Sequence, residues 1–408
     1  MALLPVEDAL SRIVDGAHAT IAQPVPLLEA RGRTLAEPLA ALRTQPPFAV
    51  SAMDGYAVNA ADVMSVPARL TMIGISAAGH RFAGRIVRGQ CVRIFTGAAL
   101  PDGADAIVIQ EDTNCEGDVA VIKEVSGVGR HVRGEGIDFI KGQTLLEAGR
   151  VLDARALTLA AAMGHATVFC RRRPTVAILA TGDELVWPGQ TPGRDSIVCS
   201  NSFGLAALVE GAGGVPVVLG IARDTHADLQ DKIAEADAAD ILVTTGGASV
   251  GDHDLVAPAL QAAGMTLDFW KIAMRPGKPL MYGVRDTPLV KSQRVLGLPG
   301  NPVSALICGR IFMVPLIHAM LGNNAAQATT RNARVTIPLE ANGPRTHFMR
   351  ATLQSVSSGD RYLQVTPIPS QDSSLVSPLA SASCLIVRAV DAPAVAAGED
   401  VTIMLIDF

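Results

Sequence analysis

The spacing of hydrophobic and polar positions changes several times along the chain and divides it into segments. In residues 1–43 apolar residues recur at helical intervals, as in the run Val6–Val14, so this segment predicts helix. Residues 46–138 are rich in glycine, valine and short strand-like runs, which is typical of a small β domain. The helical pattern returns in residues 156–164.

Strand-like and helix-like runs alternate from Arg173 onwards. Short buried runs predict strands at 176–180, 215–219, 240–244 and 280–284, and the remaining periodic runs predict helices at 202–210, 225–238, 258–263 and 302–320. Because such alternation makes the strands parallel and places helices on both faces, we expect a doubly wound α/β domain. A linker follows at 322–324, and strand-like runs within 333–408 predict a small all-β domain.

Composition narrows the class of protein. A chain of 408 residues usually needs more than one hydrophobic core, and a net charge of −5 gives no reason to expect nucleic acid as a partner. The first ten residues contain Glu7 and Asp8 but no basic segment, and the apolar run at 156–169 is shorter than the about 20 residues that span a bilayer. We therefore expect no secretory signal and no membrane segment. The six cysteines are scattered without a Cys-x-x-Cys pair, which indicates reduced thiols and a cytoplasmic location.

Charge is distributed unevenly between two neighbouring segments. Residues 181–260 hold three basic and twelve acidic residues, a balance of −9, whereas residues 271–350 hold eleven basic and two acidic residues, a balance of +9. Solvated helix faces explain part of this, including the acidic residues within 228–237. The two segments nevertheless offer one acidic and one basic surface, as an anion bound together with a divalent cation requires.

Three glycine-containing loops adjoin predicted strands in the α/β segment. They are Ala180–Leu185, Thr244–Asp254 and Leu298–Ser304. In an open α/β sheet the loops at the carboxyl ends of the strands gather around the ligand, and glycines let backbone amides approach an oxyanion closely. The need for a tight turn would explain one such loop, but three in one domain favour a phosphorylated ligand.

Acidic side chains lie in or beside these loops. They are Asp183, Glu184, Asp224, Asp252 and Asp254. Capping of the following helices is one explanation, and for Asp252 it can be the whole explanation. Carboxylates beside phosphate-binding loops are also the usual ligands of Mg²⁺, so we predict a magnesium site here.

Three cations surround the turn that Pro276 and Gly277 predict. They are Lys271, Arg275 and Lys278, within eight positions of one another. A single lysine there would be read as a solvated surface charge. Three cations beside an anion-binding loop instead predict a site for a tetrahedral oxyanion, in which the planar fork of arginine and the point charge of lysine need not be equivalent.

Eight short runs spread over the whole chain have a distinctive composition. They are Pro46–Ala57, Ile94–Ala98, Leu100–Asp105, Gln110–Asp112, Thr181–Leu185, Gly246–Asp252, Arg275–Pro279 and Leu298–Ser304. In composition and in order these runs resemble the signature segments of the molybdopterin molybdenumtransferases, the molybdenum insertases, a family related to the gephyrin E domain.

The resemblance implies a subunit of four parts. Residues 1–43 and 139–172 would form an elongated helical domain, 44–138 a β-rich insertion, 173–323 the molybdopterin-binding α/β domain, and 324–408 a C-terminal β-barrel-like domain. It further implies a homodimer whose cleft joins the α/β domain of one subunit to the insertion of the other.

The resemblance also implies a reaction, the Mg²⁺-dependent insertion of molybdate into adenylyl-molybdopterin with release of AMP. The matching catalytic positions are Asp54, Thr96, Glu184, Asp224 and Asp254, of which Glu184, Asp224 and Asp254 would hold Mg²⁺. The positions that would bind molybdate and the pterin phosphate are Gly182, Ser249, Lys271, Arg275, Lys278, Pro299, Pro302, Ser304, Arg345, Arg350 and Ser373. Contact with the molybdopterin adenylyltransferase that makes the substrate is a further implied partnership.

Three departures from the family pattern bear on the site. Arg275 stands where lysine is usual, His347 where an acidic residue is usual, and Ser383-Cys384 where Asn-Gly is usual. The sequence leaves several functions open besides that of a molybdate-inserting enzyme. The adenylyltransferase shares the α/β domain, but it lacks the Pro-Pro-Phe segment and the C-terminal β domain. A receptor scaffold of the gephyrin type, an inactive paralogue and an enzyme that uses tungstate would each share these segments.

Overall fold

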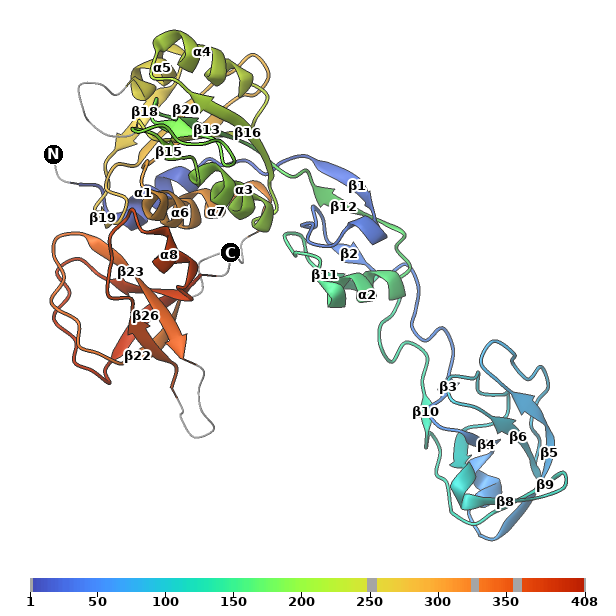
Figure 1. Ribbon diagram of the computed structural model, residues 1–408. Helices are drawn as coiled ribbons and strands as arrows, with labels where there is room; N and C mark the ends of the chain where they lie inside the picture. The colour runs from blue at the N-terminus through green and yellow to red at the C-terminus, as the bar shows by residue number, and fades with distance from the viewer. Residues whose placement is uncertain (1–2, 248–254, 324–329, 355–361, 407–408) are drawn as a thin grey trace.

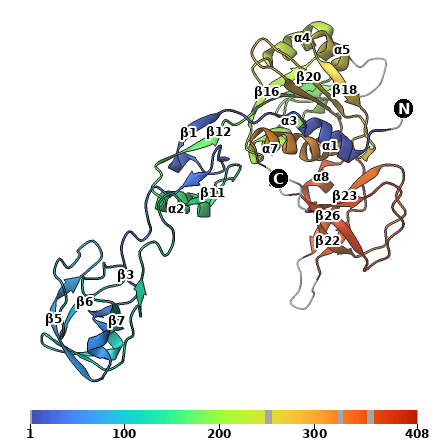
Figure 2. The same cartoon turned by 180° about the vertical axis from the view of Figure 1, so that it is seen from behind.

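The computed structural model describes residues 3–247, 255–323, 330–354 and 362–406. The molecule is elongated and bent (Figures 1 and 2). An α/β domain and a C-terminal barrel lie side by side at one end, a β-rich insertion forms the other end, and a small middle unit joins them.

The middle unit is built from two stretches that are far apart in sequence. Strand β1 (Ala22–Pro26) pairs antiparallel with β12 (Thr167–Arg171), and β2 (Leu39–Ala40) pairs antiparallel with β11 (Thr144–Leu146). The helical elements are the 3-10 turn η1 (Leu27–Glu29) and the helix α2 (Ala154–Ala162). Leu35, Phe139 and Leu152 are buried at its centre. The two stretches meet as expected, but short strands contribute to this unit as much as helix does.

The first helix, α1 (Val6–Val14), belongs to the α/β domain and not to the middle unit. Ala9 and Ile13 on its apolar face are fully buried in the α/β core. The helical spacing identified the helix correctly. It could not identify the covering surface, because a nine-residue helix is stabilised by whichever apolar face it packs against.

The insertion is built on one six-stranded sheet, which agrees with the predicted β domain. The strand order is β7 (Ala106–Ile109), β4 (Gly55–Val58), β6 (Gln90–Ile94), β5 (Ala68–Ser76), β9 (Val119–Ile122) and β8 (Thr113–Glu116). The pair β3 (Val50–Ser51) and β10 (Val132–Arg133) leads into it, and the 3-10 turns η2 (Ala60–Val63) and η3 (Gln110–Asp112) connect its strands.

The α/β domain confirms the predicted doubly wound architecture. Its sheet has the order β16 (Val215–Ala222), β13 (Thr175–Thr181), β17 (Ile241–Thr245), β21 (Gln293–Leu298), β20 (Met281–Arg285) and β18 (Thr266–Trp270). The first four strands are parallel, and β20 is antiparallel to both of its neighbours. A small parallel pair, β14 (Leu185–Val186) and β15 (Ile197–Val198), lies in the connection after β13.

Helices cover both faces of this sheet. One face carries α1, α3 (Asn201–Gly211), α6 (Pro302–Cys308), the π-helical turn η4 (Gly309–Met313) and α7 (Val314–Met320); the other carries α4 (His226–Glu235) and α5 (Val256–Ala262). Alternate residues of β13 reach the two cores, since Val176 and Ile178 pack on the first face and Ala177 and Leu179 on the second. Burial on both faces explains why the strand reads as a continuous apolar run.

Within the described ranges, one helical run, Pro302–Met320, is long and apolar enough to cross a membrane by length and composition alone. Because 72 % of its most apolar window is buried inside the α/β domain, its apolar character is that of a core helix.

The C-terminal region closes into a five-stranded barrel, as the sequence indicated. Its strands are β22 (Thr330–Val335), β23 (Thr346–Gln354), β24 (Gln364–Pro367), β25 (Cys384–Arg388) and β26 (Asp400–Leu405), and the β23–β25 pairing closes the ring. Helix α8 (Val376–Ala380) lies in the connection after β24. Strand β19 (Met274–Arg275), which precedes β20 in the chain, pairs with β23 and so ties the α/β domain to the barrel.

The six cysteines are all free thiols, five of them buried and Cys115 exposed. This agrees with the expectation of reduced cysteines.

We expect the free energy of unfolding to depend on Asp240, where the middle unit enters the α/β sheet. Its carboxylate accepts two hydrogen bonds from Arg172, at 2.9 and 2.7 Å, and one from the backbone N–H of Thr175 at 2.7 Å. Asp240→Ala leaves a largely buried set of donors without an acceptor, so it should lower the free energy of unfolding by about 2 kcal/mol. Urea unfolding followed by the fluorescence of Trp187 and Trp270 measures this change, because both tryptophans lie in the α/β domain.

The matched control is Asp268→Ala. Asp268 forms one exposed ion pair with Arg12 at 3.1 Å, and such pairs contribute at most about 0.5 kcal/mol. Equal effects of the two substitutions would show that the Asp240 contacts carry no special stability.

Candidate functional site

A cavity of about 750 Å³ opens at the carboxyl edge of the parallel strands. The loops after β13, β17 and β21, the three that the sequence singled out, all line it. The chain goes from β13 to β16 on one side and returns to β17 on the other, so the strand order reverses between β13 and β17. Ligands of open α/β sheets bind at such a reversal. This cavity is therefore the candidate active site.

Two glycines shape the first two loops, and one of them allows the loops to touch. Gly246 has φ of +91°, and a Cβ on it would lie 2.4 Å from the carbonyl oxygen of Thr181. Gly182 has φ of +144°, and a Cβ there would lie 2.4 Å from a carboxylate oxygen of Glu184. A side chain at position 246 would push the two loops apart, and one at position 182 would displace the Glu184 carboxylate within its own loop.

The third loop brings Pro299 and Pro302 to the cavity wall and is held by Asn201. The Asn201 side-chain amide donates to the carbonyl oxygen of Gly300 at 2.7 Å. Its other atom, Oδ1, is buried without a hydrogen-bond partner among the described residues. The first turn of α3 also lines the cavity, and Ser200 before it makes no side-chain cap. An unpaired buried acceptor in a cavity wall is a place where a ligand donor can bind.

Sequence reasoning did not identify Asn201. Its position directly before an apolar helical run would have suggested an ordinary cap. The bond to Gly300 depends on the third loop, which is about a hundred residues away in the chain.

The acidic side of the cavity contains Glu184 and Asp224, with Asp183 close by. The Asp224 N–H donates to a carboxylate oxygen of Asp183 at 3.2 Å. Partial withdrawal from solvent raises the pKa of Asp224, and repulsion from Asp183 and Glu184 raises it further. The carboxylates therefore destabilise one another in the absence of a cation.

This donor set fits a magnesium ion only in part. Among the described residues no three His, Cys, Asp or Glu side chains are close enough to hold a metal on their own. Two carboxylates combined with phosphate oxygens are nevertheless a usual Mg²⁺ set, and the mutual repulsion at Asp224 is the kind that a dication relieves. The predicted third ligand Asp254 lies outside the described residues, as do Ser249 and Asp252.

Positive charge gathers where the α/β domain meets the barrel. In register, Arg275 of β19 lies opposite His347 of β23, and His347 lies opposite Arg388 of β25. Burial, and after it the positive charges of Arg275, Arg345 and Arg388, lower the pKa of His347 to about 4. We call Arg275, Arg345, His347 and Arg388 the arginine cluster. Every charge that shifts His347 is positive, so the cluster favours an anion.

The turn Arg275–Pro279 connects the arginine cluster to the cavity. Pro279 lines the cavity, and Lys278 beside it is exposed. The longer loop that contains this turn begins at Lys271, which has φ of +87°. A hydrogen bond from the N–H of Ile272 to the carbonyl oxygen of Lys278, at 3.1 Å, closes the loop. Of this turn only Pro279 lines the cavity, so the predicted cations Lys271, Arg275 and Lys278 lie near the cavity in the chain without forming its wall.

Two residues predicted to bind substrate are buried and do not line the cavity. Arg350 is buried, and its guanidinium donates to the carbonyl oxygens of Ser370, Asp372 and Leu375 at 3.0, 2.8 and 2.9 Å. Ser304 is also buried, within α6, and does not line the cavity. Arg350 does not line the cavity, and three of its donors hold the loop 370–375, so a direct substrate contact of Arg350 stays a prediction.

That loop carries the contribution of the barrel to the site. Ser373 Oγ accepts from the side chain of Asn301 at 3.0 Å, and the Ser373 carbonyl oxygen accepts from the N–H of Val303. Ser374 and Val376 line the cavity directly. Ser373 therefore fastens the barrel to the third loop, and Arg350 acts on the cavity through this loop.

Asp54 and Thr96 form a second group, far from the cavity of the same chain. The N–H and the hydroxyl of Thr96 donate to one oxygen of Asp54 at 2.7 and 2.8 Å, and these bonds hold the pKa of Asp54 below its usual value. Both residues lie in the insertion, at the opposite end of the molecule from the α/β domain (Figures 1 and 2). Within one subunit the predicted site residues thus fall into two separate places.

Comparison with known proteins agrees with this architecture over the whole chain. Family models match residues 4–164 (MoeA N-terminal region, domains I and II), 177–319 (probable molybdopterin binding domain) and 332–406 (MoeA C-terminal region, domain IV).

Named relatives cover most of the chain. The molybdopterin molybdenumtransferase of Haemophilus influenzae is 34 % identical over 92 % of both chains, and that of a Nostoc species is 39 % identical over 73 % of this chain and 69 % of its own. The crystal structure of a molybdopterin biosynthesis MoeA protein from Pyrococcus horikoshii superposes with a TM-score of 0.83, at 30 % identity, over 99 % of each chain. The chain therefore belongs to the MoeA family of molybdopterin molybdenumtransferases, enzymes of molybdenum cofactor biosynthesis.

Proposed function

We propose that this enzyme inserts molybdate into adenylyl-molybdopterin in a Mg²⁺-dependent reaction that releases AMP. The observation that carries the proposal is one cavity with an acidic wall and, a short turn away from it, a cluster of positive charge. Glu184 and Asp224 make the wall acidic, and the turn Arg275–Pro279 leads from the cavity to the arginine cluster. A phosphoanhydride with its metal suits the acidic wall, and a tetrahedral dianion suits the cluster.

The chemistry of the walls suits a pterin and its phosphates. A cavity of about 750 Å³ is large enough for a cofactor-sized ligand. Asn201 Oδ1 can accept a hydrogen bond from a pterin amino group, while Gly182 and Gly246 let the backbone approach the phosphates. Pro299 and Pro302 give the third loop a rigid apolar edge for the ring.

Glu184, Asp224 and Asp254 are the proposed Mg²⁺ ligands. When bound, the metal would neutralise charge on the phosphoanhydride during its cleavage. Until then Asp183 and Glu184 keep Asp224 in an unfavourable charge environment, so these side chains are arranged to gain from cation binding. Asp254 enters this assignment through the family resemblance alone.

Arg275, Lys278 and Arg345 are the proposed molybdate-binding side chains. Arg275 offers a planar fork and Lys278 a point charge, and Arg345 lies close enough to His347 to lower its pKa. Their role is to concentrate a dianion next to the pterin sulfurs. Tungstate has nearly the same charge and shape, so both oxyanions belong in the assay.

We also propose that the active enzyme is a homodimer in which the insertion of one subunit completes the cavity of the other. Two observations support this. Asp54 and Thr96 lie beside Met53 and Phe95, apolar side chains that are 41 % and 37 % exposed, and the cavity rim carries Ile197 and Val198, which are 58 % and 43 % exposed. Apolar surfaces next to site residues are typical of surfaces that a partner covers.

The free state of all six thiols supports a reducing compartment, and we place the enzyme in the cytoplasm. Contact with the molybdopterin adenylyltransferase remains part of the proposal, because the substrate must pass from that enzyme to this one.

We expect Asp224→Asn to lower the rate of molybdate-dependent AMP release by about 10²-fold or more, because the amide cannot neutralise a bound cation. The assay follows AMP formed from adenylyl-molybdopterin with Mg²⁺ and either molybdate or tungstate. Asp231→Asn is the control, since it makes the same change in charge on an exposed face of α4. If the wild-type enzyme releases no AMP with either oxyanion, the proposed reaction is wrong.

A mixture of two inactive variants tests the shared site. Asp54→Ala and Asp224→Asn each disable every site of their own homodimer. A random heterodimer has one intact site and one doubly altered site, so an equimolar mixture after subunit exchange should recover about a quarter of wild-type activity. If both groups served the same chain, the mixture would stay as inactive as its components.

The pH dependence of stability should report the charge of the arginine cluster. The pKa of His347 is about 4 in the folded enzyme and 6.5 when unperturbed, so the unfolded state binds more protons than the folded state between these values. The free energy of unfolding should therefore fall as the pH is lowered through this window, by up to about 1.4 kcal/mol per pH unit.

Urea unfolding between pH 7 and pH 5 measures the slope of the free energy of unfolding against pH. His347→Gln should flatten this slope, whereas the control His80→Gln, at an exposed position, should leave it unchanged. Saturating molybdate should reduce the wild-type slope, because an anion stabilises the imidazolium. A slope that molybdate leaves unchanged would argue against oxyanion binding at the arginine cluster.

A further inference from the structure

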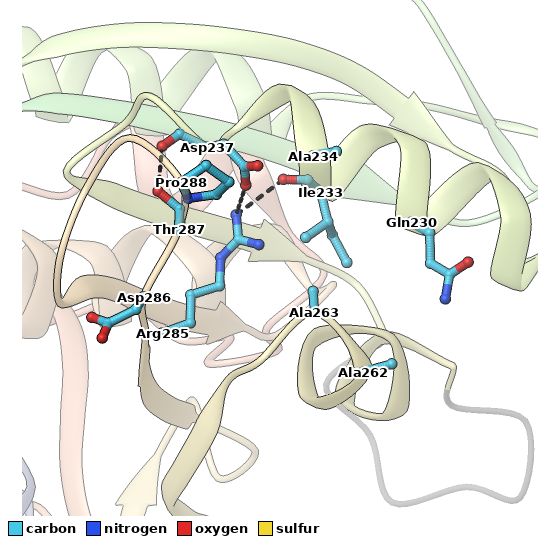
Figure 3. A pocket seen from close by; sticks show the side chains of 10 residues that line it. All are labelled: Gln230, Ile233, Ala234, Asp237, Ala262, Ala263, Arg285, Asp286, Thr287 and Pro288. Carbon is cyan, nitrogen blue, oxygen red and sulfur yellow. Dashed lines mark hydrogen bonds and ion pairs between the residues drawn. The ribbon is translucent and has the colours of Figure 1, made fainter.

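A second cavity lies at the opposite edge of the same sheet. It measures about 290 Å³ and is bounded by α4, α5 and the turn between β20 and β21 (Figure 3). Strand β20 is antiparallel to β21 and ends at Arg285, opposite Gln293, where β21 begins. This is the amino-terminal edge of the parallel strands, whereas the catalytic cavity lies at their carboxyl edge, so the two cavities are separate.

A buried arginine forms one wall of this second cavity. The Arg285 side chain is only 3 % exposed. Its Nε donates to the side-chain oxygen of Gln293 at 2.6 Å, and its Nη2 donates to Asp237 and to the carbonyl oxygen of Ile233, both at 3.0 Å. The remaining nitrogen, Nη1, has no partner among the described residues, and in Figure 3 it points into the hollow, towards the side where Ala263 and Gln230 lie.

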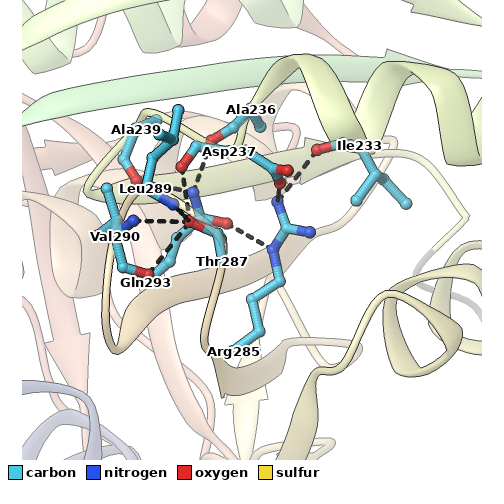
Figure 4. Close-up of polar contacts among 9 residues, drawn as sticks. All are labelled: Ile233, Ala236, Asp237, Ala239, Arg285, Thr287, Leu289, Val290 and Gln293. Carbon is cyan, nitrogen blue, oxygen red and sulfur yellow. Dashed lines mark hydrogen bonds and ion pairs between the residues drawn. The ribbon is translucent and has the colours of Figure 1, made fainter.

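The neighbouring side chains fix this orientation (Figure 4). Gln293 is fully buried, and its amide donates to the carbonyl oxygens of Ala236 and Ala239, both at 2.7 Å. Its oxygen is therefore turned towards Arg285 and cannot move away without loss of those bonds. Thr287 accepts from the N–H groups of Leu289 and Val290 and donates to the carbonyl oxygen of Asp237, which holds the turn against α4. The free N–H donors of Nη1 are thus preorganised towards the cavity.

Charge and shape restrict what can bind there. Asp237 already neutralises the guanidinium, and Asp286 stands on the rim, so a phosphate or another multivalent anion would meet repulsion. The rest of the wall is largely apolar, with Ile233, Ala234, Ala262, Ala263 and Pro288. The volume corresponds to a ligand of about ten non-hydrogen atoms, at about 30 Å³ each. The charged side chains of Asp237 and Asp286 in this wall make the surface unsuited to docking an apolar protein face.

We propose that this second cavity binds a compact, uncharged molecule with an apolar body and a carbonyl oxygen, as in an aromatic or aliphatic primary amide. The carbonyl oxygen of the ligand accepts a hydrogen bond from Arg285 Nη1, and its apolar body packs between α4 and α5. Gln230 lies in the same wall, and its exposed amide can bind a second polar group of the ligand. The site is separate from the catalytic cavity and does not depend on the reaction proposed above.

The experiment uses 4-fluorobenzamide and 4-fluorobenzoate as probes, with binding followed by ¹⁹F NMR on the full-length enzyme. A ligand of this size in a preformed pocket should bind with a dissociation constant in the millimolar range. The amide should bind at least about tenfold more tightly than the carboxylate, because the carboxylate adds charge beside Asp237 and Asp286.

Two variants locate the bound probe. Arg285→Met removes the donor and should weaken amide binding at least about tenfold. Because loss of a buried arginine can impair folding, Ala262→Leu provides a second test: this position is exposed in the free enzyme, and the larger side chain fills the cavity without disturbing the core. It should abolish binding.

Asp231→Asn, on the outer face of α4, and Glu184→Ala, in the catalytic cavity, should leave binding unchanged. The proposal is overturned if the amide does not bind at about 10 mM, if the carboxylate binds equally well, or if Ala262→Leu binds the amide like the wild type.

Discussion

The reversal of strand order between β13 and β17 positions the α/β-domain loops that line the candidate active site. The chain leaves β13 for β16 on one side and returns to β17 on the other, so the loops that follow the two strands diverge at their carboxyl ends. Gly246 keeps the backbones in contact at the base of this gap, because its missing Cβ would lie 2.4 Å from the Thr181 carbonyl oxygen. The acidic side chains after β13 and β16, the first turn of α3 and the Pro-Gly-Asn-Pro loop all take their places around this one opening.

The arginine cluster near the cavity depends on a second constraint, the short pairing of β19 with β23. Two residues of β19 bring the barrel against the α/β domain, and the same register places Arg275, His347 and Arg388 in one row. Arg350 and Ser373 then fasten the barrel loop to the third loop of the cavity. The barrel therefore acts on the site by holding a loop and by assembling positive charge. A neutral histidine among three arginines keeps this region free of an internal counter-ion.

Much of the fold could be predicted from the sequence, because the patterns that reveal it are local. Alternating strand and helix runs predicted the doubly wound sheet, and the three glycine loops marked its functional edge. Features that depend on contacts between distant segments were not predictable. The apolar face of α1 gave no indication that it packs in the α/β core, and the position of Arg350 in a familiar motif suggested substrate binding although its donors are used by three carbonyl oxygens. Asn201 and Arg285 escaped notice for the same reason, since each is defined by partners from other elements.

The elongated shape gives a physical reason for the two separate groups of site residues. A narrow middle unit that carries the insertion far from the α/β domain buries little surface for its length, so the position of the insertion brings no stability to its own subunit. Asp54 and Thr96 are nevertheless already joined by two short hydrogen bonds, and exposed apolar side chains lie beside them. A preorganised polar pair with an apolar border, at the end of an extended arm, is the arrangement expected of half a binding site. In the proposed homodimer the other half comes from the α/β domain of a second copy, because this domain has an acidic cavity with an exposed apolar rim.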